Sequence, residues 1–163
     1  MSDGVPAGSA KRLRFPPGYR QIRESDTNQV VSSGNPDMDR FQAGEYYEWS
    51  KLAGHFVVVH VVRGTLAALL HVYLERDAGS DETYLVLDML VVDERFQGRG
   101  IGRVMVEIGD DIADQLSISE RRLEALTESL VGLYAKFGFV RYGPPRSYPG
   151  WANPVYPMRK RVG

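Results

Sequence analysis

Three glycines at alternate positions, Gly98, Gly100 and Gly102, join an apolar segment that ends at Val92 to an amphipathic one that begins at Ile101. Glycine has no Cβ, so the backbone there can turn sharply and approach a ligand closely. A helix that starts at such a turn presents unpaired N–H groups and the positive end of its dipole. Such helix ends bind anions, most often phosphate or pyrophosphate. The segment therefore predicts a site for a nucleotide-like cofactor.

The spacing of the glycines narrows the choice of cofactor. A dinucleotide-binding G-x-G-x-x-G would need a glycine three residues after Gly100, where the chain has Arg103. A phosphate-binding P-loop needs a Gly-Lys pair, and the sequence contains none. From Gln97 to Gly102 the chain reads Q-x-x-G-x-G instead. Taken alone, this pattern would also suit an ordinary glycine-rich turn between a strand and a helix.

A second pattern lies at 133–139, where the chain reads L-Y-A-K-F-G-F. Gly138 is expected to end a short helix and Phe139 to begin a strand. Together the two patterns resemble the GNAT superfamily of acyl-CoA-dependent N-acyltransferases. Q-x-x-G-x-G resembles its pyrophosphate loop, and the second pattern resembles the helix after its fifth strand. Ile22, Arg23 and Asp26 weakly resemble the family's first strand.

This resemblance implies a V-shaped opening between the strand ending at Val92 and a strand at 122–127, with acetyl-CoA as the acyl donor. The pantetheine arm would bond to the backbone from Leu90 through Val91 to Val92, much as an added strand does. The pyrophosphate would rest on the N–H groups of Gln97, Gly98, Arg99, Gly100, Ile101 and Gly102. Arg95, Arg99 and Arg103 would add positive charge, although a solvated surface would explain them equally well.

The resemblance also assigns a general acid, Tyr134, near the thioester sulfur. A tyrosine pKa of roughly 10 keeps the hydroxyl protonated at neutral pH. Asp88 interrupts an apolar strand, and burial there would favour a carboxylate that acts as a base near neutral pH. A structural carboxylate would explain Asp88 equally well, and Glu124 is the second candidate base. Without cysteine no acyl-cysteine can form, so direct attack by a primary amine in a ternary complex is expected.

Two departures keep other functions open. Seven residues before the tyrosine the family commonly has an asparagine that bonds to pantetheine, and here it is Thr127, which lacks the two-sided amide. A weaker cofactor site, a longer acyl group or a catalytically silent acyl-CoA-binding domain would follow. Residues 33–41 loosely resemble the C-G-x-x-x-L-D-x-F stretch of toxins that acetylate aminoacyl-tRNA, with Ser33 in place of cysteine. Binding of charged tRNA would then weaken steeply with salt.

The whole chain has 163 residues, 43% of them hydrophobic and 25% charged, with a formal net charge of −1. These values predict one globular domain, 18–163, after a flexible tail at 1–17. Neither a nucleic acid, apart from that tRNA, nor a membrane is expected as a partner. The absence of cysteine and of an apolar leader favours the cytoplasm. His55, His60 and His71 lack metal-ligand spacing, so no metal is expected, and His60 and His71 are expected to be satisfied strand residues.

Strands are expected at 19–23, 56–62, 66–76, 84–92, 122–127, 139–142 and 155–162, and helices at 101–116 and 129–137. Asp37 would cap a further helical segment, interrupted at Gly44. Pro157 places the last strand at an edge or a bulge. This order favours an α+β fold with a mixed α/β sheet covered by helices on both faces, and the resemblance implies a mostly antiparallel sheet of GNAT type.

The acceptor would be a small-molecule or peptide amine, because the resemblance assigns specificity to the segments 26–53 and 143–154. Neither segment has a clear pattern. Tyr148 and Trp151 would close over the acceptor, or they would form the contact of a homodimer.

Overall fold

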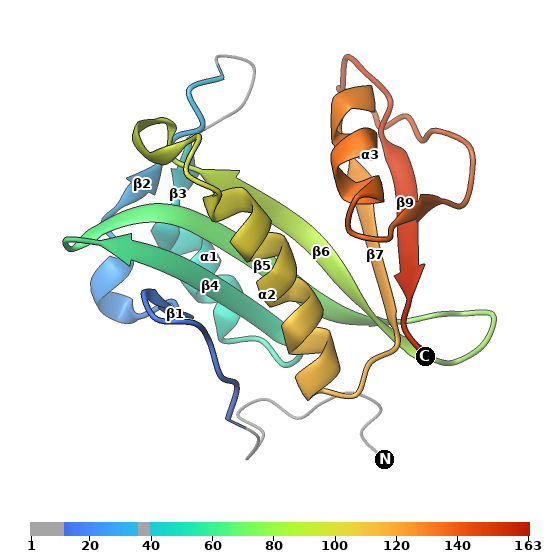
Figure 1. Ribbon diagram of the computed structural model, residues 1–163, viewed down its shortest axis with the longest axis horizontal. Coiled ribbons are helices and arrows are strands. Elements are labelled where there is room, and N and C mark those ends of the chain that lie inside the picture. Colours follow the sequence, from blue (N-terminus) through green and yellow to red (C-terminus); the bar gives the residue numbers. More distant parts are fainter. Residues whose placement is uncertain (1–11, 36–39) are drawn as a thin grey trace.

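Seven strands form one sheet in the order β1-β4-β5-β6-β7-β9-β8 in the computed structural model, which describes residues 12–35 and 40–163 (Figure 1). These strands are β1 (Tyr19–Gln21), β4 (His55–Val62), β5 (Thr65–Arg76), β6 (Thr83–Val92), β7 (Glu120–Ala125), β8 (Val140–Arg141) and β9 (Tyr156–Arg161). A separate pair consists of β2 (Val30–Val31) and β3 (Phe41–Gln42). The helices are α1 (Ala43–Ser50), α2 (Ile101–Gln115) and α3 (Glu128–Ala135), with single 3-10 turns η1 (Glu24–Asp26) and η2 (Glu94–Phe96).

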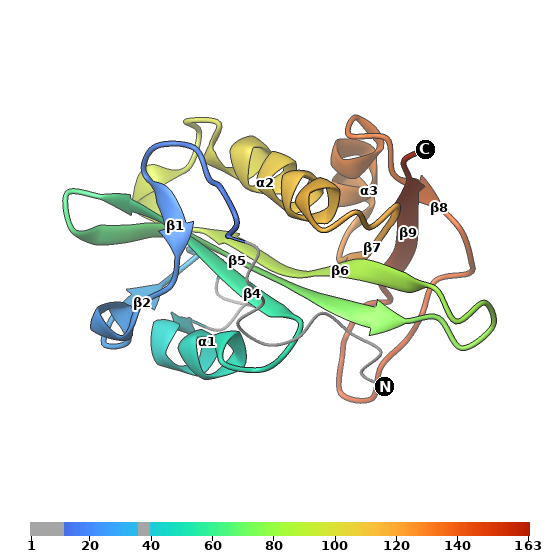
Figure 2. The same cartoon turned by 90° about the horizontal axis from the view of Figure 1, so that it is seen from below.

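Helices cover both faces of the sheet, as expected. α1 lies on one face, and α2 and α3 lie on the other (Figure 2). The apolar residues of α2 fall on one side because Ile101, Met105, Ile108 and Ile112 recur at helical spacing, and all four are buried against the sheet. Within the described residues, β6 and β7 form the one parallel pair of the large sheet. The mixed, mostly antiparallel α+β architecture is thereby confirmed.

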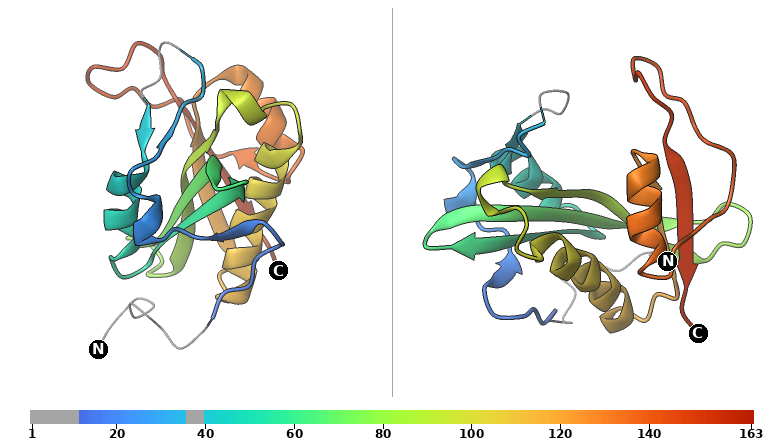
Figure 3. Two further views of the ribbon diagram at one scale, coloured as in Figure 1. Left: turned by 90° about the vertical axis from the view of Figure 1, so that its left-hand side faces the viewer. Right: turned by 45° about the horizontal axis from the view of Figure 1, so that its top comes forward.

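The parallel pairing of β6 with β7 is short. Leu85–Leu87 pair with Arg121–Leu123, and beyond Leu87 the two strands separate (Figures 1 and 3). The Asp93 N–H donates to the Ala67 carbonyl on β5, 2.8 Å away. Because hydrogen-bonded pairs alternate in an antiparallel ladder, the backbone polar groups of Leu90 and Val92 face away from β5. These groups therefore line the side on which β6 has lost its partner.

Residues 12–17, which the sequence places in a flexible tail, pack against the domain instead. Leu13 is buried in the core beneath α2. The side chain of Gln115 accepts a hydrogen bond from the Arg14 N–H (2.9 Å) and donates one to the Arg14 carbonyl (3.0 Å). Two apolar side chains, Leu13 and the partly buried Phe15, and one amide pair anchor this segment, and none of them belongs to a periodic pattern that the sequence could reveal.

The helix expected after Asp37 begins instead at Ala43 in the described part of the chain, while Asp37 lies outside it. Gly44 does not interrupt this helix. A Cβ at Gly44 would come within 3.1 Å of the Thr27 carbonyl, so the missing side chain allows the first turn of α1 to approach that residue.

The prediction that Pro157 places the last strand at an edge or a bulge is wrong. β9 lies between β7 and β8 and pairs with both without a register shift. The Pro157 carbonyl accepts from the Tyr142 N–H, so the absent proline N–H also faces the β8 side. β8 ends at Arg141, and the missing donor therefore falls where the ladder stops.

Candidate active site

The turn before α2 depends on two glycines. Gly98 and Gly100 have φ values of +79° and +80°, in the left-handed region that side chains with a Cβ rarely adopt. An added Cβ would meet no atom within 4 Å at either position, so the space beside both residues is open. Gly102 lies inside α2 without a positive φ, and its Cβ would make an ordinary 3.8 Å contact with Val92. The left-handed backbone therefore explains why glycine occurs at 98 and 100, but it does not explain Gly102.

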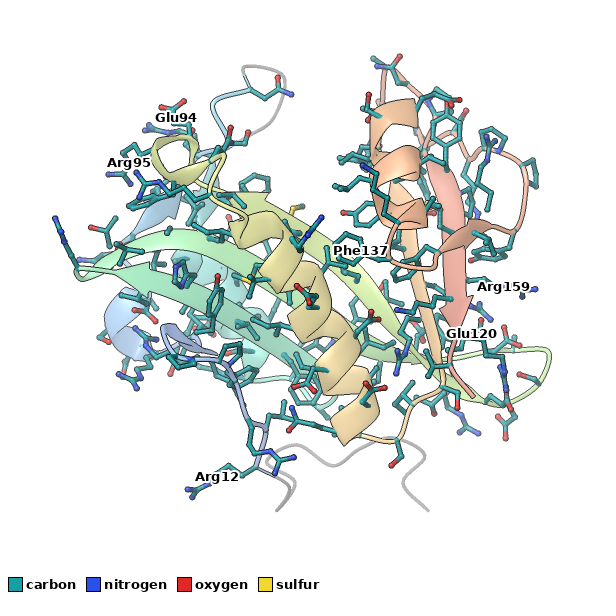
Figure 4. All side chains as sticks on the ribbon, viewed as in Figure 1. Arg12, Glu94, Arg95, Glu120, Phe137 and Arg159 are labelled. Atoms are coloured by element: carbon teal, nitrogen blue, oxygen red, sulfur yellow. The ribbon has the colours of Figure 1, made fainter. Side chains whose placement is uncertain are left out.

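Seven consecutive backbone N–H groups, those of 97–103, donate to no protein acceptor in the described part of the chain. The first intrahelical bond of α2 runs from the Val104 N–H to the Gly100 carbonyl. The amides before it are thus available to a ligand, at the positive end of the helix dipole. Glu94 and Arg95 mark the preceding turn at this end of the molecule (Figure 4). The glycine spacing predicts an anion site here, and these free amides are the donors that such a site requires.

The side chain of Gln97 holds this turn in place. Its Nε2 donates to the Val92 carbonyl (3.0 Å) and to the Ser33 carbonyl (2.9 Å). The Val92 carbonyl is therefore occupied, whereas the N–H of Val92 and both backbone groups of Leu90 remain directed toward the opening. Val91, between them, has its side chain in the core on the α1 face.

The three arginines near the turn are not equivalent. The guanidinium of Arg95 binds the buried carboxylate of Asp93, with Nε 2.8 Å from Oδ1. Desolvation raises the pKa of Asp93, but the hydrogen bonds from Arg95 and Ser32 outweigh it, and the pKa lies below its usual range. The Arg99 guanidinium lies over the Phe96 ring at 5.3 Å, and Arg103 is exposed. Arg99 and Arg103 form no ion pair among the described residues, so their charges remain available to an anion.

Tyr134 lies on α3 and packs into the core on the α2 side of the sheet. Its ring meets Phe139 edge to face, with centroids 6.1 Å apart. Desolvation raises the pKa of Tyr134, so the hydroxyl is protonated at neutral pH. Within residues 12–35 and 40–163 no group bonds to this hydroxyl. The residue predicted as the general acid thus carries a proton that no other protein group uses.

Thr127 forms the N-cap of α3. Its Oγ1 accepts a hydrogen bond from the Leu130 N–H at 3.1 Å. Its hydroxyl proton remains able to donate, which is the one contact that threonine could offer in place of the family's asparagine.

Asp88 differs from the expectation. The sequence predicts a buried carboxylate, but the side chain is 44% exposed. The reason is a register shift in the β5–β6 ladder, where His71 pairs with Met89 and Val72 pairs with Leu87. Asp88 is the extra residue of this bulge, and its Oδ2 accepts a hydrogen bond from Nδ1 of His71 at 2.9 Å. An exposed carboxylate held by a histidine can reach a substrate without being buried.

Two histidines belong to this site, and the sequence analysis missed their connection to Asp88. His71 is 3% exposed, and its Nε2 lies 3.0 Å from Nδ1 of His55. Hairpin counting could have placed the two residues close together: Glu75 pairs with Tyr84 across the turn, and an unbroken register from that pair would set His71 opposite Asp88, although the bulge sets it opposite Met89. The expectation of a satisfied ring is confirmed for His71, and also for His60, whose Nδ1 lies 2.9 Å from the Gly18 carbonyl.

Glu124, the second candidate base, is engaged by the 143–154 loop. Its Oε2 accepts from the Tyr148 hydroxyl at 2.6 Å and from Arg146 at 3.1 Å. Tyr148 in turn contacts Trp151, with ring centroids 5.2 Å apart, and the indole is exposed. Glu124 therefore anchors this loop beside the split between β6 and β7.

Three further observations concern a metal site, a membrane-spanning helix and the resemblance to tRNA-acetylating toxins. Across the described residues no set of three histidine or acidic side chains is arranged to hold a metal ion. In the same part of the chain, every helix is too short or too polar to cross a membrane. The stretch 33–41 that resembles tRNA-acetylating toxins includes 36–39, which lie outside the described residues.

Comparisons with known proteins agree with this geometry. The family profile described as Acetyltransferase (GNAT) family matches residues 19–139. A comparison with curated protein sequences finds no match. Among solved structures, Naa50 of Arabidopsis thaliana, bound to the bisubstrate analogue CoA-Ac-MVNAL, superposes with a TM-score of 0.63 at 17% identity over 88% of this chain and 97% of that one.

Two other solved structures show the same fold. Naa20 of Chaetomium thermophilum, in complex with a bisubstrate analogue, gives a TM-score of 0.66 at 19% identity over 88% of this chain and 86% of its own. Ard1 of Thermoplasma volcanium gives 0.66 at 19% identity over 88% and 96%.

Proposed function

This chain belongs to the GNAT acetyltransferase family, and we propose that it transfers an acetyl group from acetyl-CoA to a primary amine by direct attack in a ternary complex. The observation that carries the proposal is the row of free N–H groups at 97–103 beside the split between β6 and β7. The two features suit the two ends of coenzyme A, a diphosphate and an amide-bearing arm.

The residues present fit this donor. The amides of Gln97, Gly98, Arg99, Gly100, Ile101 and Gly102 would hold the diphosphate, with Arg99 and Arg103 adding charge. The open backbone groups of Leu90 and Val92 would bond to the pantetheine amides, and the Thr127 hydroxyl would donate to the same arm. Acetyl-CoA supplies an activated thioester carbonyl and a thiol leaving group.

Asp88 and Tyr134 lie on opposite faces of the sheet. Asp88 bonds to His71 on the α1 face, and Tyr134 packs on the face covered by α2 and α3. We assign Asp88 to remove a proton from the attacking amine, because its carboxylate is exposed. Tyr134 would protonate the departing sulfur, since its hydroxyl is protonated and otherwise unbonded. Such proton transfers each contribute on the order of 10²–10⁴ in rate.

A peptide amine is the first acceptor to test. The Naa50 structure contains an analogue that joins coenzyme A to the peptide MVNAL, and another structure of the same fold, of the NatC complex, contains a Gag peptide and CoA. Small amines remain alternatives, because Tyr148, Trp151 and the 26–53 segment would determine the choice.

The test measures thiol release from acetyl-CoA with a panel of free-N-terminus peptides, lysine-containing peptides and small amines. The chain has no cysteine, so a thiol reagent sees only released coenzyme A. Amine-dependent release supports the proposal. Coenzyme A binding without release from any acceptor would favour the catalytically silent alternative, and failure to bind at millimolar concentration would overturn the assignment.

A further inference from the structure

Asp88 stands at the end of a chain of hydrogen-bonded side chains that runs across three strands. Oδ2 of Asp88 on β6 lies 2.9 Å from Nδ1 of His71 on β5. Nε2 of His71 lies 3.0 Å from Nδ1 of His55 on β4. Both imidazole nitrogens of His71 are therefore engaged, and the ring is buried. His55 and His71 are diagonal neighbours, because His55 pairs with Tyr73.

With a neutral His71 ring and an ionised Asp88, the chemistry of these partners allows one arrangement of the protons. An ionised carboxylate only accepts hydrogen bonds, so Nδ1 of His71 must carry the proton that it donates to Asp88. In a neutral imidazole the other nitrogen then has a lone pair, and Nε2 of His71 must accept. The donor to it is Nδ1–H of His55. Asp88 and His55 therefore both favour the Nδ1–H tautomer of His71, the form that can donate to the carboxylate.

Aromatic rings enclose this chain on the α1 face. Tyr46 and Trp49 from α1 and Tyr73 from β5 each have their ring centroid 5.8 Å from that of His71. Desolvation, followed by the charge of Asp88, raises the pKa of Tyr46 to about 12, and the same causes raise the pKa of Tyr73 to about 12. Both phenols are therefore neutral at physiological pH.

Three acidic residues lie near this series of hydrogen-bonded side chains. The charge of Glu45 on α1 raises the pKa of Tyr46, and the charges of Glu75 and of Glu124 on β7 raise the pKa of Tyr73. The charge of Glu75 also acts to raise the pKa of His55. Desolvation, then the neighbouring His71, nevertheless lowers the pKa of His55 below its usual value. His55 is therefore neutral at pH 7 and above, and a neutral ring that donates through Nδ1 has no proton on Nε2.

We propose that His71 is a positioning residue for the Asp88 carboxylate and that His55 stabilises the Nδ1–H tautomer of His71. The inference rests on the proposed function of Asp88 as the base. His71 occupies Oδ2, which leaves Oδ1 to take the proton of the amine. As the amine nitrogen bonds to the carbonyl carbon, its proton passes to Oδ1. The carbon–sulfur bond breaks, and the sulfur takes its proton from Tyr134.

Two variants of His55 separate hydrogen bonding from packing. His55→Phe keeps a ring that can stack on Trp49 and Tyr73 but loses the donor. His55→Asn loses the ring but keeps an N–H donor, because Asn Nδ2 is two bonds from Cβ, as Nδ1 of histidine is. His60→Phe is the matched control: it lies on the same strand, and its ring stacks on Tyr19.

We expect His55→Phe to lower kcat/KM for the amine about tenfold or more, because a poorly oriented carboxylate loses part of the roughly 10²–10⁴ in rate that a general base contributes. His55→Asn should keep the activity within about threefold, and the KM for acetyl-CoA and the His60→Phe kinetics should not change. Loss of activity in His55→Asn with full activity in His55→Phe would assign His55 to packing and overturn the inference.

A measurement without substrate keeps this inference separate from the proposed function. Nitrogen-15 spectra of the histidine side chains, recorded on the unliganded protein, report which ring nitrogen bears the proton. We expect the Nδ1–H tautomer for His71 in the native protein and in His60→Phe, and a shift toward Nε2–H in His55→Phe. An Nε2–H tautomer of His71 in the native protein would overturn the inference, even if the acetyltransferase is active.

Discussion

At the scale of single residues, the assignment of the general acid depends on Tyr134. The Tyr134→Phe variant keeps the edge-to-face packing on Phe139 and removes only the hydroxyl, which bonds to no group in the described chain. We expect kcat to fall about 10²- to 10³-fold while coenzyme A binding, measured by calorimetry, stays unchanged. Because desolvation raises the pKa of Tyr134, the native enzyme should lose its acid only above about pH 10.

A control tyrosine is available at the far end of the sheet. Tyr19 lies on β1, at the opposite edge from β8, and Tyr19→Phe should leave both kcat and coenzyme A affinity unchanged. If Tyr134→Phe retains the native rate, the proton must reach the sulfur from another source, and the acid assignment fails.

At the scale of elements, the turn into α2 contains two glycines that its backbone conformation requires, Gly98 and Gly100, and one that it does not require, Gly102. Gly98→Ala and Gly100→Ala place a Cβ in the left-handed region and should each cost about 1–2 kcal/mol of folding free energy in urea titrations. Both should also weaken coenzyme A binding, because the amides would be displaced. Gly102→Ala should not destabilise the fold, since its Cβ makes an ordinary contact inside a helix.

Gly64 offers the matched control for that series. It has a φ of +77° in the turn between β4 and β5, and a Cβ there would meet nothing within 4 Å. Gly64→Ala should have a similar folding cost with unchanged coenzyme A affinity. Equal loss of affinity in Gly64→Ala and Gly100→Ala would mean that binding follows stability rather than the geometry of this turn.

The connection from β1 to η1 depends on a buried ion pair. The carboxylate of Asp26 accepts from both terminal nitrogens of Arg20, at 2.8 and 2.9 Å, and from the Arg23 N–H at 2.8 Å. The bonds from Arg20 hold the pKa of Asp26 below its usual value. Asp26→Asn should lower the free energy of unfolding by about 1–3 kcal/mol at pH 7.

The destabilisation caused by Asp26→Asn should depend on pH in one direction. A lowered folded-state pKa stabilises the fold above the unfolded value of about 3.9, and the contribution is lost as pH falls through the folded value. Unfolding curves of native protein and Asp26→Asn should therefore be separated by a constant amount near neutrality and converge below about pH 4. Glu48→Gln, which removes an exposed pair with Lys51, should show no such change. A gap that does not narrow as the pH falls below about 4 would contradict this account.

Local patterns predicted the elements that local chemistry determines. The spacing of apolar residues predicted α2 within one residue, and the glycine spacing predicted the free amides at its start. The sequence pattern predicts a strand over 122–127, whereas Thr127 caps α3 through its bond to the Leu130 N–H. Thr followed by Glu is a helix-start signal from which this role could have been predicted. The contacts of His71 with Asp88 and with His55 depend on register across three strands and on a bulge, which periodicity along one strand does not contain.

At the scale of the whole molecule, the sheet consists of two parts joined by a short seam. β1, β4, β5 and β6 form one part, β7, β9 and β8 form the other, and three residue pairs of β6 and β7 connect them (Figure 3). The free amides of 97–103, Leu90 and Val92 belong to the first part, whereas Thr127 and Tyr134 follow β7 in the second. A donor bound in the split would therefore contact both parts and stabilise their relative position.

Hydrogen exchange can test this bridging role residue by residue. In the unliganded protein the amides of Leu90 and Val92 should exchange quickly, although they lie in a central strand, because they face the split. The Val91 amide between them faces β5 and should exchange slowly. Acetyl-CoA at about 100 times its Kd should slow exchange at Leu90, Val92 and 97–103, and should raise the unfolding free energy by about 2.7 kcal/mol. The Val58 amide is the control: Val58 is buried and paired in β4, so its exchange rate should not change. Protection confined to β4 or to the 143–154 loop would place the ligand elsewhere and would contradict the bridging of β6 to β7.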